Sequence, residues 1–287
     1  MYFPDSGARG CPGLHRLLGV DHVDRAHLRD PADDTFTISR YAVAADLSDL
    51  ARRFWIPTWD VPAGREAPQR VLQYPVCLVV VSNTYARLYG VTPGLGGTTL
   101  VGRGWAVGVM LQPAAGALLT DGRPVSELND RHVPLQCVGG FDDGLVEAVR
   151  AVMAAGPTDP ARHARARALV EEALRTYLPV DDEGLLVNRI VAAVEDDAQI
   201  LRVHQVCERF DLTERALQRL TRRRIGLSPK WLIRRRRLHE ASGRLRESGT
   251  ELAALAADLG YTDQAHFTRD FRSATGLTPG AFAGRFR

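Results

Sequence analysis

The stretch that decides the fold is LAALAADLGYTDQAHFTRDFRSATGLTP, residues 252–279. Apolar residues recur at helical spacing on both sides of a break at Gly260 and Tyr261, which predicts two short helices joined by a tight turn. In the second helix Phe267 and Phe271 are expected to face inward. This pair of helices is typical of a helix-turn-helix unit whose second helix has a polar outer face.

The same plan occurs once more in the C-terminal third, in VHQVCERFDLTERALQRLTRRRIGLSP at residues 203–229. An offset of 50 residues places Gly226 on Gly276 and Pro229 on Pro279. Thr213 is a predicted N-cap of the second helix, because its hydroxyl can accept a hydrogen bond from the first turn. One supersecondary unit is therefore expected twice, in tandem.

The segment between the units, SPKWLIRRRRLHEASGRLRES at residues 228–248, is predicted to be one long helix with Trp231 and Leu238 on one face. At about 1.5 Å per residue, roughly twenty residues span about 30 Å. That length is close to the roughly 34 Å of one turn of DNA. The arginines at residues 234–237 wrap around this helix, so we expect one or two to meet phosphates and the others to be solvated or to pair with Glu240.

Charge is distributed unevenly along the chain, whose formal net charge is +3. Residues 199–287 hold 18 Arg and Lys against 9 Asp and Glu, so this part is basic and the remainder is acidic. A basic region joined to an acidic one is typical of a protein that binds a polyanion, with nucleic acid the leading candidate. A solvated basic surface is the alternative, and the repeated turn signals argue against a helix lying on anionic lipid.

The outer faces of the two second helices carry arginine and glutamine. Arginine can donate two hydrogen bonds to N7 and O6 of guanine, and glutamine can pair with N6 and N7 of adenine. The repeat therefore predicts a domain that binds double-stranded DNA, with the second helix of each unit in the major groove. The alternative is a plain helical bundle in which the glycine and proline caps recur because helix ends need them.

These motifs resemble the AraC/XylS family of bacterial transcriptional regulators over residues 185–287. The signature residues of the second unit are Leu255, Ala256, Leu259, Gly260, Tyr261, Phe267, Arg269, Phe271, Gly276, Thr278 and Pro279. The resemblance implies base reading by Arg215, Gln218, Arg219, Gln264, Ala265 and Arg269. Phosphate contacts are expected from Thr213, Arg222, Arg223, Lys230 and Arg272. Two positions depart from the family: Ala265 can only touch a thymine methyl, and Thr221 stands where an aromatic is usual.

Before this domain, β-rich runs alternate with Gly and Pro from Thr35 to about Val138, which predicts an antiparallel, barrel-like β domain. SELNDRH at residues 126–132 is expected to be a short helix. Helices are also predicted for residues 142–155 and 161–178. The fold class is therefore α+β. The expected domains are a β-rich sensor or dimerisation domain at 1–140, a helical linker and dimer interface at 141–182, and the double helix-turn-helix domain at 183–287.

The family resemblance implies that the β domain binds a small effector or a partner subunit. An aromatic effector pocket would use Trp55, Trp59, Tyr85 and Trp105, although ordinary β-domain core is the favoured interpretation of these residues. We therefore expect a transcriptional regulator controlled by an effector or partner. A homodimer and a contact with RNA polymerase stay open, as does a regulator whose β domain binds only another protein.

Other functions find little support in the sequence. No apolar run long enough to span a membrane and no secretory signal are evident, so a cytoplasmic protein is expected. His15, His22, His27 and His132 lack a compact metal-ligand pattern, and neither a metal nor a cofactor is expected. Cys77 and Cys137 lie in apolar context, which argues against a cysteine-dependent DNA repair enzyme. We therefore expect no enzymatic activity, with that repair or regulatory function kept as a lesser alternative.

Overall fold

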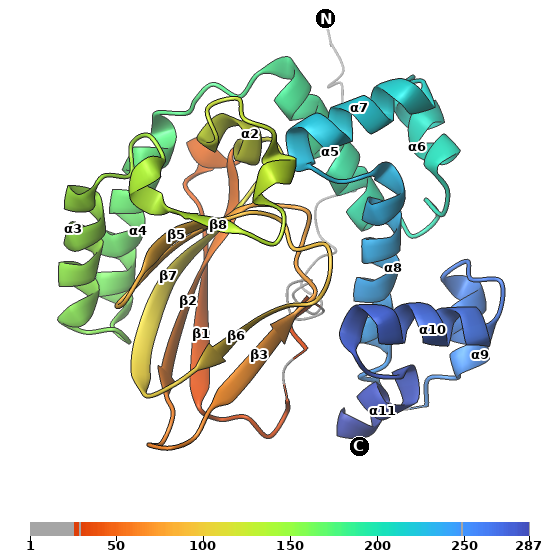
Figure 1. Cartoon of the computed structure of the whole chain (residues 1–287), viewed down its shortest axis with the longest axis horizontal. Coiled ribbons are helices and arrows are strands. Elements are labelled where there is room, and N and C mark those ends of the chain that lie inside the picture. Colours follow the sequence, from red (N-terminus) through yellow and green to blue (C-terminus); the bar gives the residue numbers. More distant parts are fainter. Residues whose placement is uncertain (1–25, 29, 248, 287) are drawn as a thin grey trace, which may run out of the picture.

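The computed structural model describes residues 26–28, 30–247 and 249–286 of the chain, with strands in the first half and helices in the second (Figure 1). A six-stranded sheet has the order β1-β2-β7-β4-β5-β8, and β3 pairs with β6 in a smaller sheet. The strands are β1 (Phe36–Ala42), β2 (Ala51–Asp60), β3 (Ala67–Val71), β4 (Leu78–Ser82), β5 (Ala86–Tyr89), β6 (Gly96–Leu100), β7 (Arg103–Leu111) and β8 (His132–Pro134). All neighbouring strands are antiparallel, which confirms the predicted class of β domain.

The short helix predicted over residues 126–132 forms only in its first part, as a 3-10 helix, and the prediction is wrong for the rest. A single 3-10 turn, η2 (Val125–Leu128), is followed by strand β8, in which His132 pairs with Tyr89 of β5. Pairing with the edge of the sheet satisfies the backbone groups of residues 132–134, so tertiary contacts override the local helical pattern.

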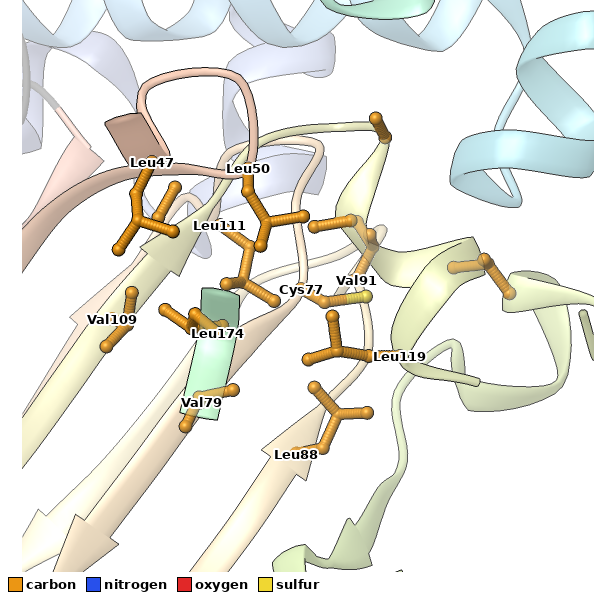
Figure 2. Packing of buried hydrophobic residues seen from close by; sticks show 14 of the residues in the cluster. Leu47, Leu50, Cys77, Val79, Leu88, Val91, Val109, Leu111, Leu119 and Leu174 are labelled. Carbon is orange, nitrogen blue, oxygen red and sulfur yellow. The ribbon is translucent and has the colours of Figure 1, made fainter. Parts of the chain in front are cut away.

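One face of the large sheet is covered by α3 (Asp143–Ala154) and α4 (Pro160–Arg175), both of which were predicted. Alternate residues of the strands point into this layer, as the period of two in a strand requires. Leu174 of α4 lies among Val79, Val109 and Leu111 of the sheet, and all four side chains are almost completely buried (Figure 2). Burial of these apolar surfaces holds the helices on the sheet.

The C-terminal half is helical. Its helices are α5 (Asp182–Asp196), α6 (Val203–Phe210), α7 (Glu214–Ile225), α8 (Pro229–Arg244), α9 (Leu252–Asp258), α10 (Gln264–Thr275) and α11 (Pro279–Ala283). The pairs α6–α7 and α9–α10 are the two predicted helix-turn-helix units, and α8 is the predicted connecting helix. Because α8 has 16 residues, its length is about 24 Å, shorter than expected from the sequence.

Helix ends follow the predicted caps. Thr213 Oγ1 accepts a hydrogen bond from the backbone N–H of Ala216 at 3.2 Å, which confirms it as the N-cap of α7. Gly226 and Gly276 close α7 and α10 with φ of +80° and +76°. Glycine adopts this left-handed conformation without the steric cost of a side chain, so each helix ends where the repeat predicted.

The two units differ in how they are buried. Leu217 and Leu220 of α7 belong to the same apolar cluster as the β-domain core, whereas Phe267 and Phe271 of α10 belong to a separate cluster. Helix α7 also packs against η2 and against α2 (Ala115–Leu119) of the β domain. The first unit is thus attached to the β domain, and the second is attached mainly to α8.

Candidate nucleic-acid interface

The positions expected to read bases lie on exposed surfaces of α7 and α10. They are Arg215, Gln218, Arg219, Gln264, Ala265 and Arg269, and all are exposed. Helical periodicity places them opposite the buried anchors Leu217 in α7 and Phe267 in α10, each with 0% exposure. The two units therefore present equivalent polar faces at equivalent positions of the repeat.

The exposed polar face of α7 has one side-chain hydrogen bond near the start of the helix. Gln218 Nε2 donates a hydrogen bond to Glu214 Oε1 at 3.0 Å, so this amide is partly occupied within the helix. Arg215 and Arg219 form no ion pair with any residue in the described part of the chain. Their guanidinium groups are thus available to an external acceptor. Thr221 stands at the position where the resemblance to the AraC/XylS family leads one to expect an aromatic residue. Its side chain is fully buried on the inner side of α7.

The position of α10, the second helix of the second unit, is fixed by its N-cap and by α8. Asp263 Oδ1 accepts a hydrogen bond from the backbone N–H of His266 at 2.7 Å, which caps the first turn of α10. Asp270 joins this helix to its neighbours, since its carboxylate accepts from Tyr261 Oη at 2.7 Å and from Arg234 Nε at 2.7 Å. Burial and the adjoining Asp270 carboxylate raise the pKa of Tyr261, which therefore stays a neutral donor.

The expected phosphate contacts divide into two groups. Arg222, Lys230 and Arg272 are exposed, as a phosphate contact requires. Arg223 is also exposed but forms an ion pair with Glu183 of α5, and an approaching phosphate would compete with that carboxylate. The Thr213 hydroxyl is used as a helix cap, although its own proton can still be donated.

The arginine run at residues 234–237 is engaged within the protein. Its partners are Asp270 for Arg234, the backbone carbonyls of Pro93 and Gly94 for Arg235, Glu240 for Arg236, and the carbonyl of Leu201 for Arg237. The pairing expected with Glu240 is thus found, at 2.7 Å from Arg236. The expectation that one or two of these arginines meet phosphates is not supported, because each guanidinium already has an intramolecular acceptor.

Of the four aromatic residues considered for an effector pocket, Trp55 and Trp59 lie on the face of the large sheet opposite α3 and α4. Trp55 stands over Gly108 and Trp59 over Gly104 on the neighbouring strand β7. A methyl group at either glycine would overlap the indole ring, so the glycines allow both rings to lie against the sheet. Trp59 also packs with Ala67 and other apolar residues of the small sheet.

The other two aromatic residues are placed differently. Trp105 points to the opposite face, into the core under α3 and α4, so it does not line a pocket together with Trp55. Tyr85 lies at the turn into β5 with Arg87 Cζ 4.6 Å from its ring centre. Burial, with smaller contributions from Tyr89, raises the pKa of Tyr85 to about 12. The structure therefore divides the predicted aromatic set between two faces of the sheet.

A cavity of about 400 Å³ lies between the β domain and the C-terminal helices. Its lining comes from β2, β7, the end of α5 and one side of α8, and includes Arg53, Tyr74, Glu195, Arg236 and His239. None of the four aromatic candidates lines it. Two ion pairs lie in its lining. Arg52 of β2 pairs with Glu195 of α5 at 2.8 Å, and Arg236 pairs with Glu240 within α8 at 2.7 Å.

Cysteine and histidine residues show no catalytic arrangement in the described part of the chain. Burial raises the pKa of the Cys77 thiol to about 12, so this thiol is protonated at neutral pH. His27 hydrogen-bonds Gln69 at 3.0 Å, and the rings of His132 and Tyr89 lie 5.3 Å apart with their planes tilted by 45°. His15 and His22 lie outside the described residues. Within residues 26–28, 30–247 and 249–286, no group of three His, Cys, Asp or Glu is arranged to hold a metal ion.

No helix in the described ranges combines the length and the apolar character that crossing a membrane would require.

Comparison with known proteins identifies the C-terminal helices. Residues 206–285 match a family described as a helix-turn-helix domain. The transcriptional activator RhaS of Escherichia fergusonii is 32% identical over 94 residues, which make up 32% of this chain and 34% of RhaS. The activator RhaR of Cronobacter sakazakii is 28% identical over 110 residues, or 36% of this chain and 39% of RhaR. The C-terminal domain is an AraC/XylS domain.

For the β domain, the comparisons give no function. Residues 39–134 match a domain of unknown function, DUF6597. The chain aligns with about a third of the length of the RhaS and RhaR relatives. A crystal structure of ToxT from Vibrio cholerae O395 covers 88% of this chain and 99% of ToxT, at 11% identity and a TM-score of 0.38.

The ion pairs between α7 and the start of α5 had no signal in the sequence. Arg224 of α7 pairs with Glu183 at 2.8 Å and with Asp181, both at the start of α5. These residues are about forty positions apart and come together only when α5 packs on α7. No local pattern of charge distinguishes Arg224 from the exposed arginines beside it.

Proposed function

We propose that this protein is a sequence-specific, DNA-binding transcriptional regulator. The observation that carries the proposal is the matched exposure of Arg219 in α7 and Arg269 in α10 on the two units of one AraC/XylS domain. Arginines on recognition helices discriminate guanine by donating two hydrogen bonds. The RhaS and RhaR relatives are described as transcriptional activators, which supports the same class of function.

The experiment is selection of binding sites from random duplexes with the full chain, followed by titration of the selected DNA. We expect a motif with two conserved patches about one helical turn apart. The variant Arg219→Ala/Arg269→Ala should lose the motif. Arg103→Ala/Arg165→Ala removes the same charge from exposed positions outside the AraC/XylS domain and should keep it. Equal loss in both double variants would contradict base reading by α7 and α10.

We infer that the β domain senses a small effector or a partner. Support comes from the face of the large sheet that bears Trp55 and Trp59, since these partly buried aromatic rings suit a flat or apolar ligand. A ligand that binds only the folded protein must raise its unfolding temperature. The effector is tested by screening small molecules for a rise in the unfolding temperature of the full chain. The same compounds are then measured on Trp59→Leu, in which the rise should be smaller. A β domain that responds only to another protein would show no rise with any small molecule.

No enzymatic activity is proposed. A DNA repair protein that accepts a methyl group on cysteine needs a thiolate, and the buried Cys77 is protonated at neutral pH. Incubation with methylated DNA and mass measurement of the protein would reveal transfer to any cysteine.

A regulator of this class acts on the chromosome in the cytoplasm, where RNA polymerase is an expected partner. We also expect the protein to form a homodimer through α3 and α4, and sedimentation of the full chain would measure its mass in solution.

A further inference from the structure

One side of α8 is attached to the β domain through a row of donors. Trp231, Arg235 and His239 are spaced four residues apart and therefore share a face of the helix. Trp231 Nε1 donates to the carbonyl of Pro93 at 3.1 Å, and His239 Nε2 donates to the carbonyl of Leu72 at 2.6 Å. All of these acceptors are backbone oxygens of the β domain.

These acceptors lie at one end of the small sheet. Leu72 directly follows β3, the loop of residues 92–94 precedes β6, and Val71 pairs with Gly96 at this end of the ladder. The other end of the same ladder packs against Trp59 of the large sheet through Ala67. The small sheet therefore connects the aromatic face of the β domain to α8.

Arg235 makes the central contact. Its Nη2 donates to the carbonyls of Pro93 and Gly94 at 2.6 and 2.9 Å, and its guanidinium lies 4.6 Å from the ring centre of Trp231. The residue is only 3% exposed and forms no ion pair with any residue of the described ranges. Burial, with a smaller effect of Arg234, lowers its pKa to about 10.

A buried cation with only carbonyl partners is costly unless those partners stay in place. If the loop of residues 92–94 moves away, Arg235 must leave the interior and become hydrated.

Helix α8 also holds both reading helices. Leu232 and Ile233 belong to the apolar cluster that contains Leu217 of α7, and Arg234 pairs with Asp270 of α10 at 2.7 Å. Because α7 is also attached to η2 and α2 of the β domain, a shift of α8 relative to that domain would move α10 relative to α7.

We propose that Arg235 is a positioning residue for DNA recognition. Arg235 holds the loop of residues 92–94 against α8 and thereby fixes the distance between α7 and α10 on the duplex. The β domain thus selects the spacing between the two conserved patches of the DNA site. This inference rests on the proposed function of the AraC/XylS domain. It assigns a role in specificity to a residue that touches no DNA.

The test uses the full chain and the duplex selected above, with one or two base pairs added or removed between the patches. Each base pair rotates the second patch by about 34°, because one turn holds about 10.5 base pairs. We expect the wild-type protein to lose about tenfold in affinity for each change, comparable to one mismatched base pair. Arg235→Met should lose less than about threefold on the same duplexes, and should bind a duplex with a single patch as the wild type does.

Two comparisons separate positioning from stability. Val79→Ala destabilises the β-domain core away from α8 and should keep the wild-type spacing profile. Arg235→Lys keeps the charge and should restore part of the spacing dependence; if Arg235→Met does not fold, this variant supplies the comparison.

A folded Arg235→Met variant with the wild-type profile would overturn the inference and leave the proposed function standing. If that variant does not fold, the wild-type profile in Arg235→Lys would overturn it. Failure of the wild-type chain to select any sequence would remove the proposed function itself.

Discussion

Asn129 Nδ2 donates a hydrogen bond to the backbone carbonyl of Gly226 at 3.1 Å, across 97 residues of sequence. The bond joins the loop after η2 in the β domain to the end of the first reading helix, α7. The same glycine approaches Ser126 so closely that a Cβ atom would lie 2.8 Å from the serine backbone. The C-terminal end of α7 is therefore both a helix cap and part of the contact between domains.

Replacement of Gly226 by alanine should destabilise the protein more than the same change at Gly276. Both glycines have positive φ, so alanine at either position costs about 1 kcal/mol in backbone strain. At Gly226 the methyl group also meets the backbone of Ser126, whereas at Gly276 it meets no atom within 4 Å. Urea unfolding measures the difference, and equal losses of unfolding free energy would contradict a close interface at Gly226.

The cap of α10 can be tested separately. Asp263→Ala removes the acceptor of the His266 N–H and should lower the free energy of unfolding by about 1 kcal/mol. Asp263→Ser keeps a capping oxygen and should retain most of that stability. If urea unfolding ranks the serine variant no better than the alanine variant, the cap is not the source of the effect.

Base contacts and phosphate contacts should respond differently to mutation. Arg269→Ala is expected to weaken binding by about 1–3 kcal/mol and to relax selectivity at one base pair. Lys230→Ala should weaken specific and random DNA alike and reduce the salt dependence of binding by about one charge. Titrations on both kinds of DNA at several salt concentrations check this. Equal effects of the two variants on both kinds of DNA would show that the assignment is wrong.

The ion pairs of Arg224 should make stability depend on acidic pH. Burial is the largest single effect and would raise the pKa of Asp181 and Glu183. The hydrogen bonds that these carboxylates accept and the positive charges of Arg224 and Arg223 together outweigh it, so both pKa values are lowered. Because the folded-state pKa is the lower one, the stabilisation is present above the unfolded pKa of about 4. It is lost as the pH falls through the folded value. Unfolding midpoints should therefore fall more steeply below about pH 4 in the wild type than in Arg224→Met.

The control for that experiment is Arg103→Met. Its ion pair with Asp60 is exposed on both sides, at 82% and 65% of the two side chains, and solvent screens such pairs. The pH profile of this variant should match the wild type. A parallel profile in Arg224→Met would exclude a linkage between α5 and α7 through these carboxyl groups.

The sequence by itself determined the helices of the two helix-turn-helix units and the caps that end them. Thr213, Gly226 and Gly276 act within one turn of the backbone, and the 50-residue repeat supplies independent evidence for each unit. The exposed reading faces also follow from local information, since the buried positions of Leu217 and Phe267 set the opposite side of each helix.

The tertiary structure alone decided which charged and aromatic side chains share a surface. Arg235 and Lys230 both look like candidates for DNA contact in the sequence, yet one is buried on carbonyls more than 140 residues away and the other is exposed. Trp105 and Trp55 similarly lie on opposite faces of one sheet. A long-range partner leaves no periodic pattern in the chain, because the free energy of burying a side chain depends on what packs against it.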